Sequence, residues 1–266
     1  MNNKSEQITA IQSYLRENAR RQYESISLHP FTLFFHPSDP LIYFNYAIPD
    51  NPAGGNLNTV LHRLGDEFRQ RGRVPRFEFL EAFAPDLPAA LITAGFRETE
   101  RQWNMVCTPE TLQPTAPIDD LTITALHPES PSVDIRDYLL AQRQGFSPGN
   151  ESIPNEADVR QARLDFLIGG WHAFLGRIGE KPAAAATFGR IIGGVTEATG
   201  IATRPLFRRR GIAAHLTWHV TNEAFRQGAR TACLTAADAA AGRIYERAGF
   251  QPFTIMLTFT SEQEPI

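Results

Sequence analysis

Residues 205–216, PLFRRRGIAAHL, place three consecutive arginines directly before a glycine and an alanine-rich apolar segment. A helix that begins after Gly211 exposes unpaired backbone N–H groups and about half a positive charge at this point, which attracts phosphate. Glycine lets an anion approach the backbone closely, and the forked donors of Arg208, Arg209 and Arg210 match phosphate oxygens. The stretch therefore predicts a pyrophosphate site at a strand-to-helix turn. The alternative is a solvated basic turn with an ordinary glycine.

The segments around this turn alternate between strand-like and helix-like patterns. We expect strands at 121–126, 171–179, 181–192, 197–205, 229–237 and 250–260, and helices at 134–146, 155–167, 211–228 and 238–249. Asn155 is expected to cap the second of these helices, because acidic residues follow it in the first turn. This order predicts an α/β unit with a mixed, largely antiparallel sheet and helices on both sides.

Part of the pattern recurs in the first half of the chain. The triplet FRQ at 68–70 recurs at 225–227, an offset of 157, and Gly95-Phe96 recurs as Gly249-Phe250, an offset of 154. Helix, strand, helix and strand follow in the same order in both copies, so we favour a duplication over chance. The Pro- and Thr-rich stretch 108–120 suggests the boundary, which predicts domains at 1–115 and 120–266.

Composition narrows the class of protein. The 266 residues are 42% hydrophobic and 21% charged, with a formal net charge of −3, which is typical of a globular protein and gives no general affinity for nucleic acid. The first residues lack the apolar core of a secretory signal, and no segment is apolar over the roughly 18 residues that a membrane span requires. Cys107 and Cys233 lie in apolar runs. We therefore expect a reduced, cytoplasmic protein without membrane or nucleic-acid partners.

Two motifs in this order resemble the GCN5-related N-acetyltransferase (GNAT) family. Arg208, Gly211 and Ala213 match its R-x-x-G-x-G/A signature, and the downstream segment 238–250 is similar to its second motif, N-x-x-A-x-x-x-Y-x-x-x-G-F. The resemblance covers roughly residues 120–260. It implies two GNAT-like units in tandem, each with a mixed, mostly antiparallel sheet flanked by helices.

The resemblance also implies where acetyl-CoA would bind. The family's pantetheine arm pairs with a strand that corresponds here to 197–205, so Ile201 and Thr203 are the expected backbone partners, with Ala202 between them. The pyrophosphate would lie on residues 208–214. The implied cofactor-binding residues are therefore Ile201, Ala202, Thr203, Arg208, Arg209, Arg210, Gly211, Ile212, Ala213, Ala214 and Asp238.

Catalytic roles follow from the same resemblance. Tyr245 occupies the position of the family's general acid, where a phenol protonates the departing thiolate; a merely packed tyrosine is the alternative. Glu197 is our candidate base, against an exposed carboxylate at a strand end. Asp238 replaces the usual asparagine, and an ionised carboxylate cannot donate the hydrogen bond that an amide donates.

No metal site is expected, because His215 and His219 lack a third ligand.

The first unit resembles a degenerate copy. Its strand would be 41–50 and its turn 51–61, which contains Gly54 and Gly55 but no arginine. Leu91 stands where Tyr245 would be. We therefore predict that this unit binds no CoA.

The resemblance implies an acetyl-CoA-dependent N-acetyltransferase that transfers the acetyl group directly to a primary amine. The alternative is a protein that binds or senses acyl-CoA without turnover. A small molecule or a peptide can supply the amine, and the sequence gives neither its identity nor the oligomeric state. The carboxylates of Glu151, Glu156 and Asp158 are candidates to attract a cationic amine, although a solvated acidic loop explains them equally well.

Overall fold

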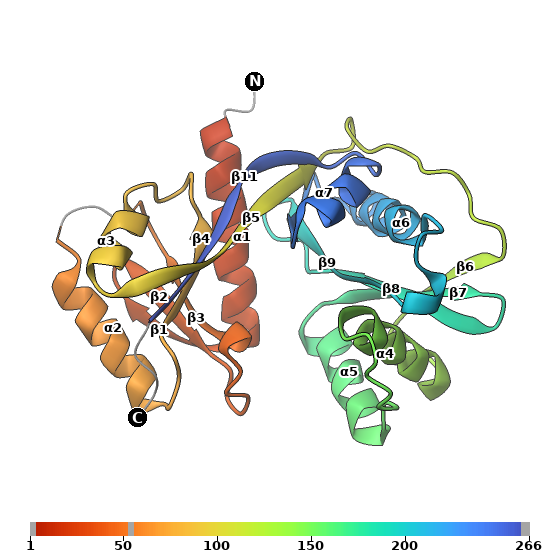
Figure 1. The fold of residues 1–266 in the computed structure, drawn as a ribbon, viewed down its shortest axis with the longest axis horizontal. Helices are drawn as coiled ribbons and strands as arrows, with labels where there is room; N and C mark the ends of the chain where they lie inside the picture. The colour runs from red at the N-terminus through yellow and green to blue at the C-terminus, as the bar shows by residue number, and fades with distance from the viewer. Residues whose placement is uncertain (1–3, 53–55, 262–266) are drawn as a thin grey trace. The chain divides into compact units, whose positions relative to one another are not determined.

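The computed structural model describes residues 4–52 and 56–261 (Figure 1). Gly54 and Gly55, named above in the predicted turn of the first unit, lie outside the described residues. The chain divides into two compact units. Unit 1 contains residues 1–104 and 253–266, and unit 2 contains residues 105–252.

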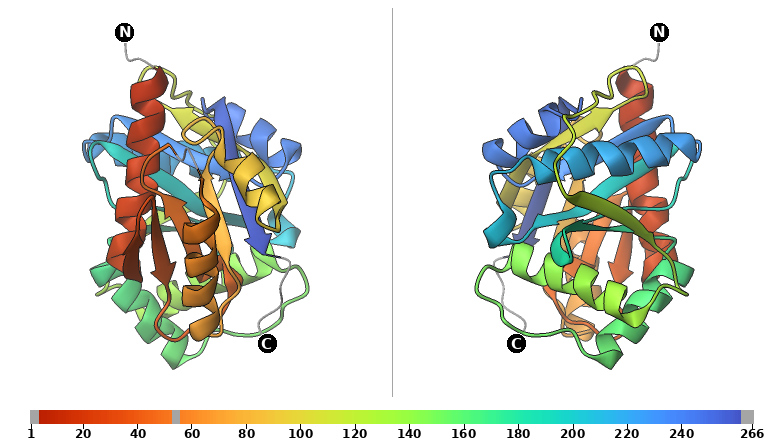
Figure 2. Two further views of the ribbon diagram at one scale, coloured as in Figure 1. Left: turned by 90° about the vertical axis from the view of Figure 1, so that its left-hand side faces the viewer. Right: turned by 90° about the vertical axis from the view of Figure 1, so that its right-hand side faces the viewer.

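Unit 1 is built on a sheet with the strand order β1-β2-β3-β4-β11-β5. Helix α1 packs on one face, through β2 and β4, and Figure 2 shows α2 and α3 on the other face. The elements are α1 (Lys4–Gln22), β1 (Glu24–Leu28), β2 (Phe31–Phe35), the 3-10 helix η1 (Ile42–Phe44), β3 (Asn45–Pro49), α2 (Asn58–Gln70), β4 (Arg76–Leu80), α3 (Leu87–Thr93) and β5 (Phe96–Cys107). The leading helix α1 thus belongs to unit 1.

Aromatic rings fill the interior of unit 1. The ring of Phe77 makes edge-on contacts with Phe31 and Phe96 at centroid distances of 5.1 and 5.4 Å. On the opposite face of the sheet, the buried side chain of Gln12 in α1 accepts a hydrogen bond of 3.0 Å from the backbone N–H of Leu80. Edge-on aromatic pairs stabilise such a core beyond the area that they bury.

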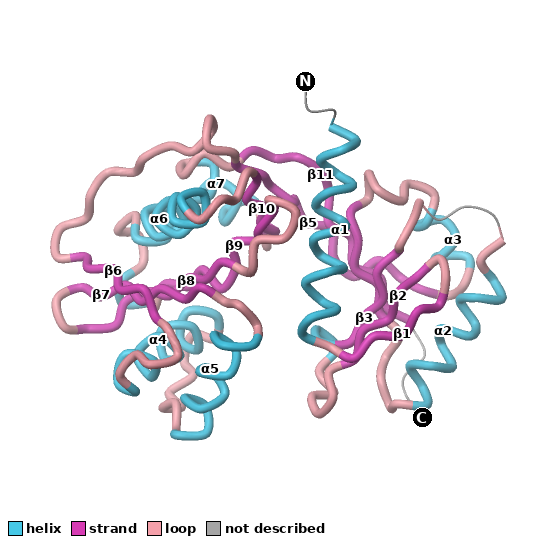
Figure 3. The backbone as a smooth tube through the Cα atoms, turned by 180° about the vertical axis from the view of Figure 1, so that it is seen from behind, coloured by secondary structure: helices cyan, strands magenta, loops and turns pink. Residues whose placement is uncertain are grey.

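Unit 2 contains the strand order β10-β9-β8-β7-β6. Figure 3 shows α6 and α7 on one face of its strands and α4 and α5 on the other. The elements are β6 (Leu121–Leu126), α4 (Ser132–Phe146), α5 (Glu156–Ile168), β7 (His172–Ile178), β8 (Lys181–Phe188), β9 (Val195–Thr203), the 3-10 helix η2 (Pro205–Phe207), α6 (Ile212–Arg226), β10 (Thr231–Ala236), α7 (Ala239–Glu246) and β11 (Gln251–Ser261). Each strand and helix predicted for this half is confirmed.

Small side chains allow helices to cover both faces of unit 2. Residues 183–186 of β8 are four consecutive alanines, all fully buried, so helices can approach the strand closely from either side. In α6, the buried residues Ile212, Leu216, Val220 and Ala224 recur every four positions and form the stripe that faces the sheet. The sheet is antiparallel from β6 to β9, whereas β9 and β10 run parallel.

The same crossover occurs in unit 1, which supports the duplication. Strands β3 and β4 run parallel and are joined through α2, as β9 and β10 are joined through α6. Strands β5 and β11 each cross the division between the units. Residues 256–260 of β11 pair with β4, so most of the strand expected in the second domain belongs to unit 1.

Among the described residues, no helix has both the length and the hydrophobicity that crossing a membrane requires.

The start of α5 provides a test of local stability. Asn155 accepts hydrogen bonds from the N–H groups of Ala157 and Asp158, and the carboxylate of Asp158 accepts one of 2.7 Å from the N–H of Asn155. Replacing Asn155 with alanine removes this capping box and should lower the free energy of unfolding by about 1 kcal/mol. Chemical denaturation measures the difference. The matched control is Asn150→Ala, since Asn150 accepts from Ser152 within the preceding loop and caps no helix; an equal loss in both variants would contradict the capping role.

Candidate active site

Strand β9 is bulged and leaves its neighbour early. Thr187 of β8 lies opposite Thr199, but Ala185 lies opposite Ala202, so β9 contains one more residue than β8 over this interval. Gly200 lies in the bulge with φ +62°, a conformation that favours glycine, and a side chain there would meet the amide of Gln142. The bulge turns the second half of β9 away from the regular ladder.

Strands β9 and β10 pair with each other only at their starts. Residues 195–197 lie opposite residues 231–233, and the described residues of the two strands form no further pair. Residues 198–203 of β9 therefore present backbone groups to the space between the strands, as an edge strand does.

The predicted strand-to-helix turn follows β9. After the 3-10 helix η2, Arg209 adopts φ +64° and Gly211 adopts φ +80°, both in the left-handed region. Helix α6 begins at Ile212, so the N–H groups of residues 212–214 have no acceptor within the helix and point out of its first turn. A turn with left-handed residues that leads into a helix start forms a concave site for an anion.

Arg208 also organises this turn. Its guanidinium donates to the backbone carbonyl of Thr203 at 3.1 Å and to that of Gly145 at 2.7 Å. The side chain thus joins the ends of β9 and α4 to the turn. Its positive charge still lies at the turn, since both acceptors are neutral carbonyls.

These elements enclose a cleft of about 720 Å³. Most of the predicted site residues line it: Tyr245, Ile201, Ala202, Thr203, Arg208, Arg209, Gly211, Ile212, Ala213 and Ala214. The Thr203 hydroxyl is buried and has no hydrogen-bond partner in the described part of the chain. The other three predicted residues, Arg210, Asp238 and Glu197, do not line the cleft.

Tyr245 enters the cleft from α7. Its ring packs beside Phe250, with 6.5 Å between the ring centroids, and its hydroxyl forms no hydrogen bond with any residue that the structure describes. Burial raises the pKa of this phenol above its ordinary value, and the negative charge of Asp238 adds to the shift. The hydroxyl therefore keeps its proton at neutral pH and can donate it within the cleft.

Asp238 caps α7. Its carboxylate accepts a hydrogen bond of 2.8 Å from the N–H of Ala241, which satisfies one of the free donors of the first turn. This position needs an acceptor but no donor, which explains why a carboxylate can stand where the family motif has asparagine. A direct contact between Asp238 and a cofactor stays a prediction.

Glu197 lies on the face of β9 that is opposite the α6 side. Ala198 packs into the core under α6, and successive strand residues alternate, so Glu197 and Thr199 face the α4 side together. Cys233 lies opposite Glu197 on β10. The thiol is buried, which raises its pKa well above the ordinary value, and the negative charge of Glu197 contributes to the shift. The side chain of Glu197 is thus partly buried near the end of the β9–β10 pairing.

Two arginines of the cleft were missed in the sequence. Arg243 in α7 and Arg247 directly after this helix both line the cleft, although both side chains are exposed. They are four residues apart, so they share one face of the helix and its continuation. The spacing was visible in the sequence, but only the structure shows that this face turns towards the cleft.

Unit 1 differs at the matching positions. Leu91, the counterpart of Tyr245, is a fully buried residue of α3. That unit 1 binds no CoA stays a prediction.

A cleft at the carboxyl ends of two diverging parallel strands, closed by the start of a helix, is typical of α/β folds that bind phosphate-bearing ligands at this edge. Residues 138–250 match the family model described as "Acetyltransferase (GNAT) family". This part of the chain is therefore similar to the domains of a family of acetyltransferases.

Solved structures extend the likeness to the whole chain. A GCN5-related N-acetyltransferase from Kribbella flavida is similar with a TM-score of 0.79 at 22% identity, over 96% of each chain. A GCN5-related N-acetyltransferase from Sphaerobacter thermophilus gives 0.64 at 19% identity, over 94% of this chain and 84% of the other. A tandem GNAT protein from the clavulanic acid biosynthesis pathway gives 0.63 at 11% identity, over 87% and 78%. The N-terminal half is therefore GNAT-like in fold. No curated protein sequence matches the chain.

Proposed function

We propose that the protein is an acetyl-CoA-dependent N-acetyltransferase whose second unit transfers the acetyl group directly to a primary amine. The observation that carries the proposal is the single cleft that joins the open edge of β9, the left-handed turn at 208–211 and the Tyr245 hydroxyl. The open strand edge suits an extended chain, the turn suits an anion, and the hydroxyl suits a departing thiolate.

The turn would hold the pyrophosphate. The N–H groups at the start of α6 supply fixed donors, and Arg209, Arg243 and Arg247 supply positive charge around the cleft. The alanines at 213 and 214 leave room for phosphate oxygens. The pantetheine arm would pair with the backbone of Ile201 and Thr203, as an added strand pairs with an exposed sheet edge.

The chemistry requires a neutral amine that attacks the thioester carbonyl carbon. A C–N bond forms, the C–S bond breaks, and the departing thiolate takes the proton of the Tyr245 phenol. A backbone N–H of the open β9 edge would stabilise the developing oxyanion. Glu197 is our proposed base and would accept the proton of the attacking nitrogen through water, since it does not line the cleft itself.

Unit 1 is proposed to bind no CoA. Its Leu91 cannot replace the Tyr245 phenol, and residues 51–61 contain no arginine. One functional cofactor site per chain follows, and calorimetry would report a stoichiometry of one acetyl-CoA.

Thermal unfolding with added ligands tests the proposal. Acetyl-CoA, free CoA and adenosine 3′,5′-bisphosphate should each stabilise the protein. At about 100 times the dissociation constant the gain is roughly 2.7 kcal/mol, a shift in Tm of about 5 °C or more. Adenosine without phosphates is the control and should shift Tm little. If millimolar acetyl-CoA leaves Tm unchanged, the proposed cofactor site is wrong.

A further inference from the structure

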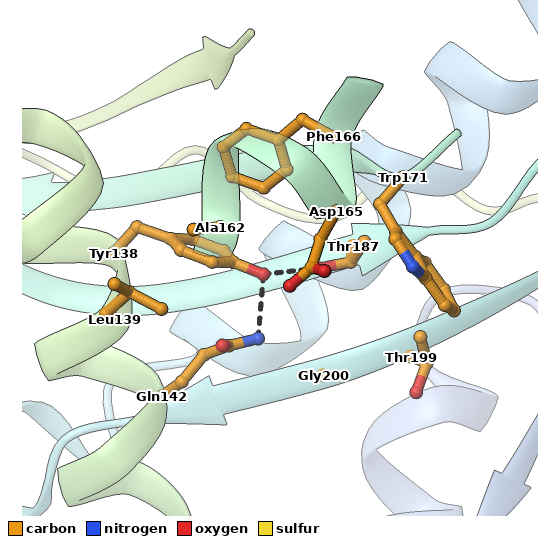
Figure 4. A pocket seen from close by; sticks show the side chains of 10 residues that line it. All are labelled: Tyr138, Leu139, Gln142, Ala162, Asp165, Phe166, Trp171, Thr187, Thr199 and Gly200. Atoms are coloured by element: carbon orange, nitrogen blue, oxygen red, sulfur yellow. Dashed lines mark hydrogen bonds between the residues drawn. The ribbon is translucent and has the colours of Figure 1, made fainter. Parts of the chain in front are cut away.

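A second cavity adjoins the proposed cofactor cleft along β9. It has a volume of about 250 Å³ and lies between α4, α5 and the sheet, on the face opposite α6 (Figure 4). Thr199 and Gly200 line this cavity, and the next three residues of the strand, 201–203, line the cleft. A molecule in the cavity would therefore reach β9 next to residues 201–203, along which the pantetheine arm is proposed to lie.

Aromatic side chains form much of the cavity wall. Trp171, Phe166 and Tyr138 contribute rings, and Leu139 and Ala162 add apolar surface. The rings of Tyr138 and Phe166 meet nearly edge-on, with 6.0 Å between their centroids. Such a wall favours an apolar or aromatic body over a polar one.

The polar groups at the floor of the cavity satisfy one another. The Tyr138 hydroxyl lies 2.7 Å from the Thr187 hydroxyl and accepts a hydrogen bond of 2.8 Å from the Gln142 amide (Figure 4). Burial raises the pKa of Tyr138 to about 12, so the phenol stays neutral. The floor therefore fixes the shape of the cavity and carries no charge.

Asp165 supplies a negative charge to the lining. Its exposed carboxylate accepts a hydrogen bond of 2.9 Å from the Gln161 amide and points in Figure 4 towards the space beside the Tyr138 hydroxyl. The described residues that line the cavity include no lysine, arginine or histidine. The site thus attracts an ammonium group and repels a carboxylate.

Two of the three acidic residues that the sequence suggested for this role, Glu156 and Asp158, have other partners. Glu156 pairs with Arg136, and Asp158 pairs with Arg143 at 2.7 Å and also caps α5. Neither lines the cavity. Asp165 takes their place because it lies about two turns after Asp158 along α5 and lines the cavity beside Phe166.

We infer that the acceptor is a small primary amine with an aromatic or compact apolar body and without a carboxylate, an arylalkylamine rather than an amino acid. This inference rests on the proposed function. The cavity is smaller than the roughly 300–1,000 Å³ of pockets for drug-sized ligands, which favours a small molecule. Asp165 draws in the ammonium form, the rings hold the body, and the amino group reaches β9.

Three acceptors separate charge from size: phenylalaninamide and phenylalanine have nearly equal shape, and 2-phenylethylamine lacks the α-substituent of both. Thiol release from acetyl-CoA should show a kcat/KM that is roughly 10-fold or more lower for phenylalanine than for the other two, because only phenylalanine brings a carboxylate to Asp165. Propylamine tests the aromatic wall and should have a higher KM than 2-phenylethylamine.

The substitution Asp165→Asn identifies the charge that is responsible. It should raise the KM for 2-phenylethylamine about 10-fold, change kcat by less than about 2-fold, and reduce the discrimination against phenylalanine. The matched control is Glu180→Gln, which removes an exposed carboxylate from the β7–β8 turn outside the cavity and should leave both constants unchanged.

The outcomes separate this inference from the proposed function. If acetyl-CoA stabilises the protein but phenylalanine is the best acceptor, or none of the amines is acetylated, the acceptor class is wrong and the cofactor site stands. If Asp165→Asn and Glu180→Gln behave alike, Asp165 does not select the acceptor. If acetyl-CoA does not bind, the proposed function itself fails.

Discussion

The double variant Arg208→Ala, Gly211→Glu is expected to bind CoA roughly 100-fold more weakly or not at all. Loss of the guanidinium removes a positive charge and the two hydrogen bonds that join the turn to Thr203 and Gly145. A charge-assisted contact is worth about 1.5–3 kcal/mol, or roughly a tenfold change in affinity or more. The new glutamate adds a carboxylate where the pyrophosphate is proposed to lie.

Gly211 makes the second substitution severe for a conformational reason as well. Its φ of +80° is a backbone conformation that residues with side chains rarely adopt, although the space around a Cβ atom there is open, with Ile118 at 3.8 Å. The glutamate therefore fits sterically but strains the turn and repels the ligand. Calorimetric titration with CoA measures the combined loss.

The other end of the same helix offers a matched control. Gly228 follows α6 with φ +99° and open space around it, and Arg226 is an exposed arginine of the last turn. The variant Arg226→Ala, Gly228→Glu makes the same change in charge and the same kind of backbone strain outside the cleft. It should bind CoA normally. Equal weakening in both variants would mean that stability, not phosphate recognition, explains the effect.

The sequence predicted the elements of unit 2 well because each depends on local signals. The alanines of β8, the apolar stripe of α6 and the Asn155 cap each lie in, or directly next to, the element that they define. The turn at 205–216 was recognisable for the same reason, since three arginines and a glycine must all lie close to one helix start.

Non-local features were not predictable in this way. That residues 256–260 pair with β4 depends on partners about 180 residues apart, and no local pattern encodes such a pairing. Arg243 and Arg247 looked like ordinary exposed arginines, because their role depends on which way α7 faces. Asp165 likewise became a candidate only when α4, α5 and β9 were seen around one cavity.

Tyr245→Phe is expected to lower kcat by roughly 10- to 100-fold and to leave the affinity for acetyl-CoA nearly unchanged. The ring stays, so packing against Phe250 is preserved, and only the hydroxyl of this cleft-lining residue is lost. Without that proton donor the thiolate must leave unprotonated or take a proton from water. Because burial raises the pKa of the phenol, the wild-type rate should not fall from deprotonation of Tyr245 until the pH exceeds the ordinary tyrosine value of about 10.

Steady-state kinetics with calorimetry of acetyl-CoA binding distinguishes the roles that the tyrosine can have. Tyr43→Phe is the matched control, since Tyr43 is an exposed tyrosine of η1, far in sequence from the cleft residues and absent from their lining. A fall in kcat alone, seen only for Tyr245→Phe, assigns the acid. Unchanged kcat in both variants would leave Tyr245 as a packing residue and transfer the protonation step to solvent, whereas a loss of affinity together with kcat would mean that the hydroxyl holds the cofactor in place.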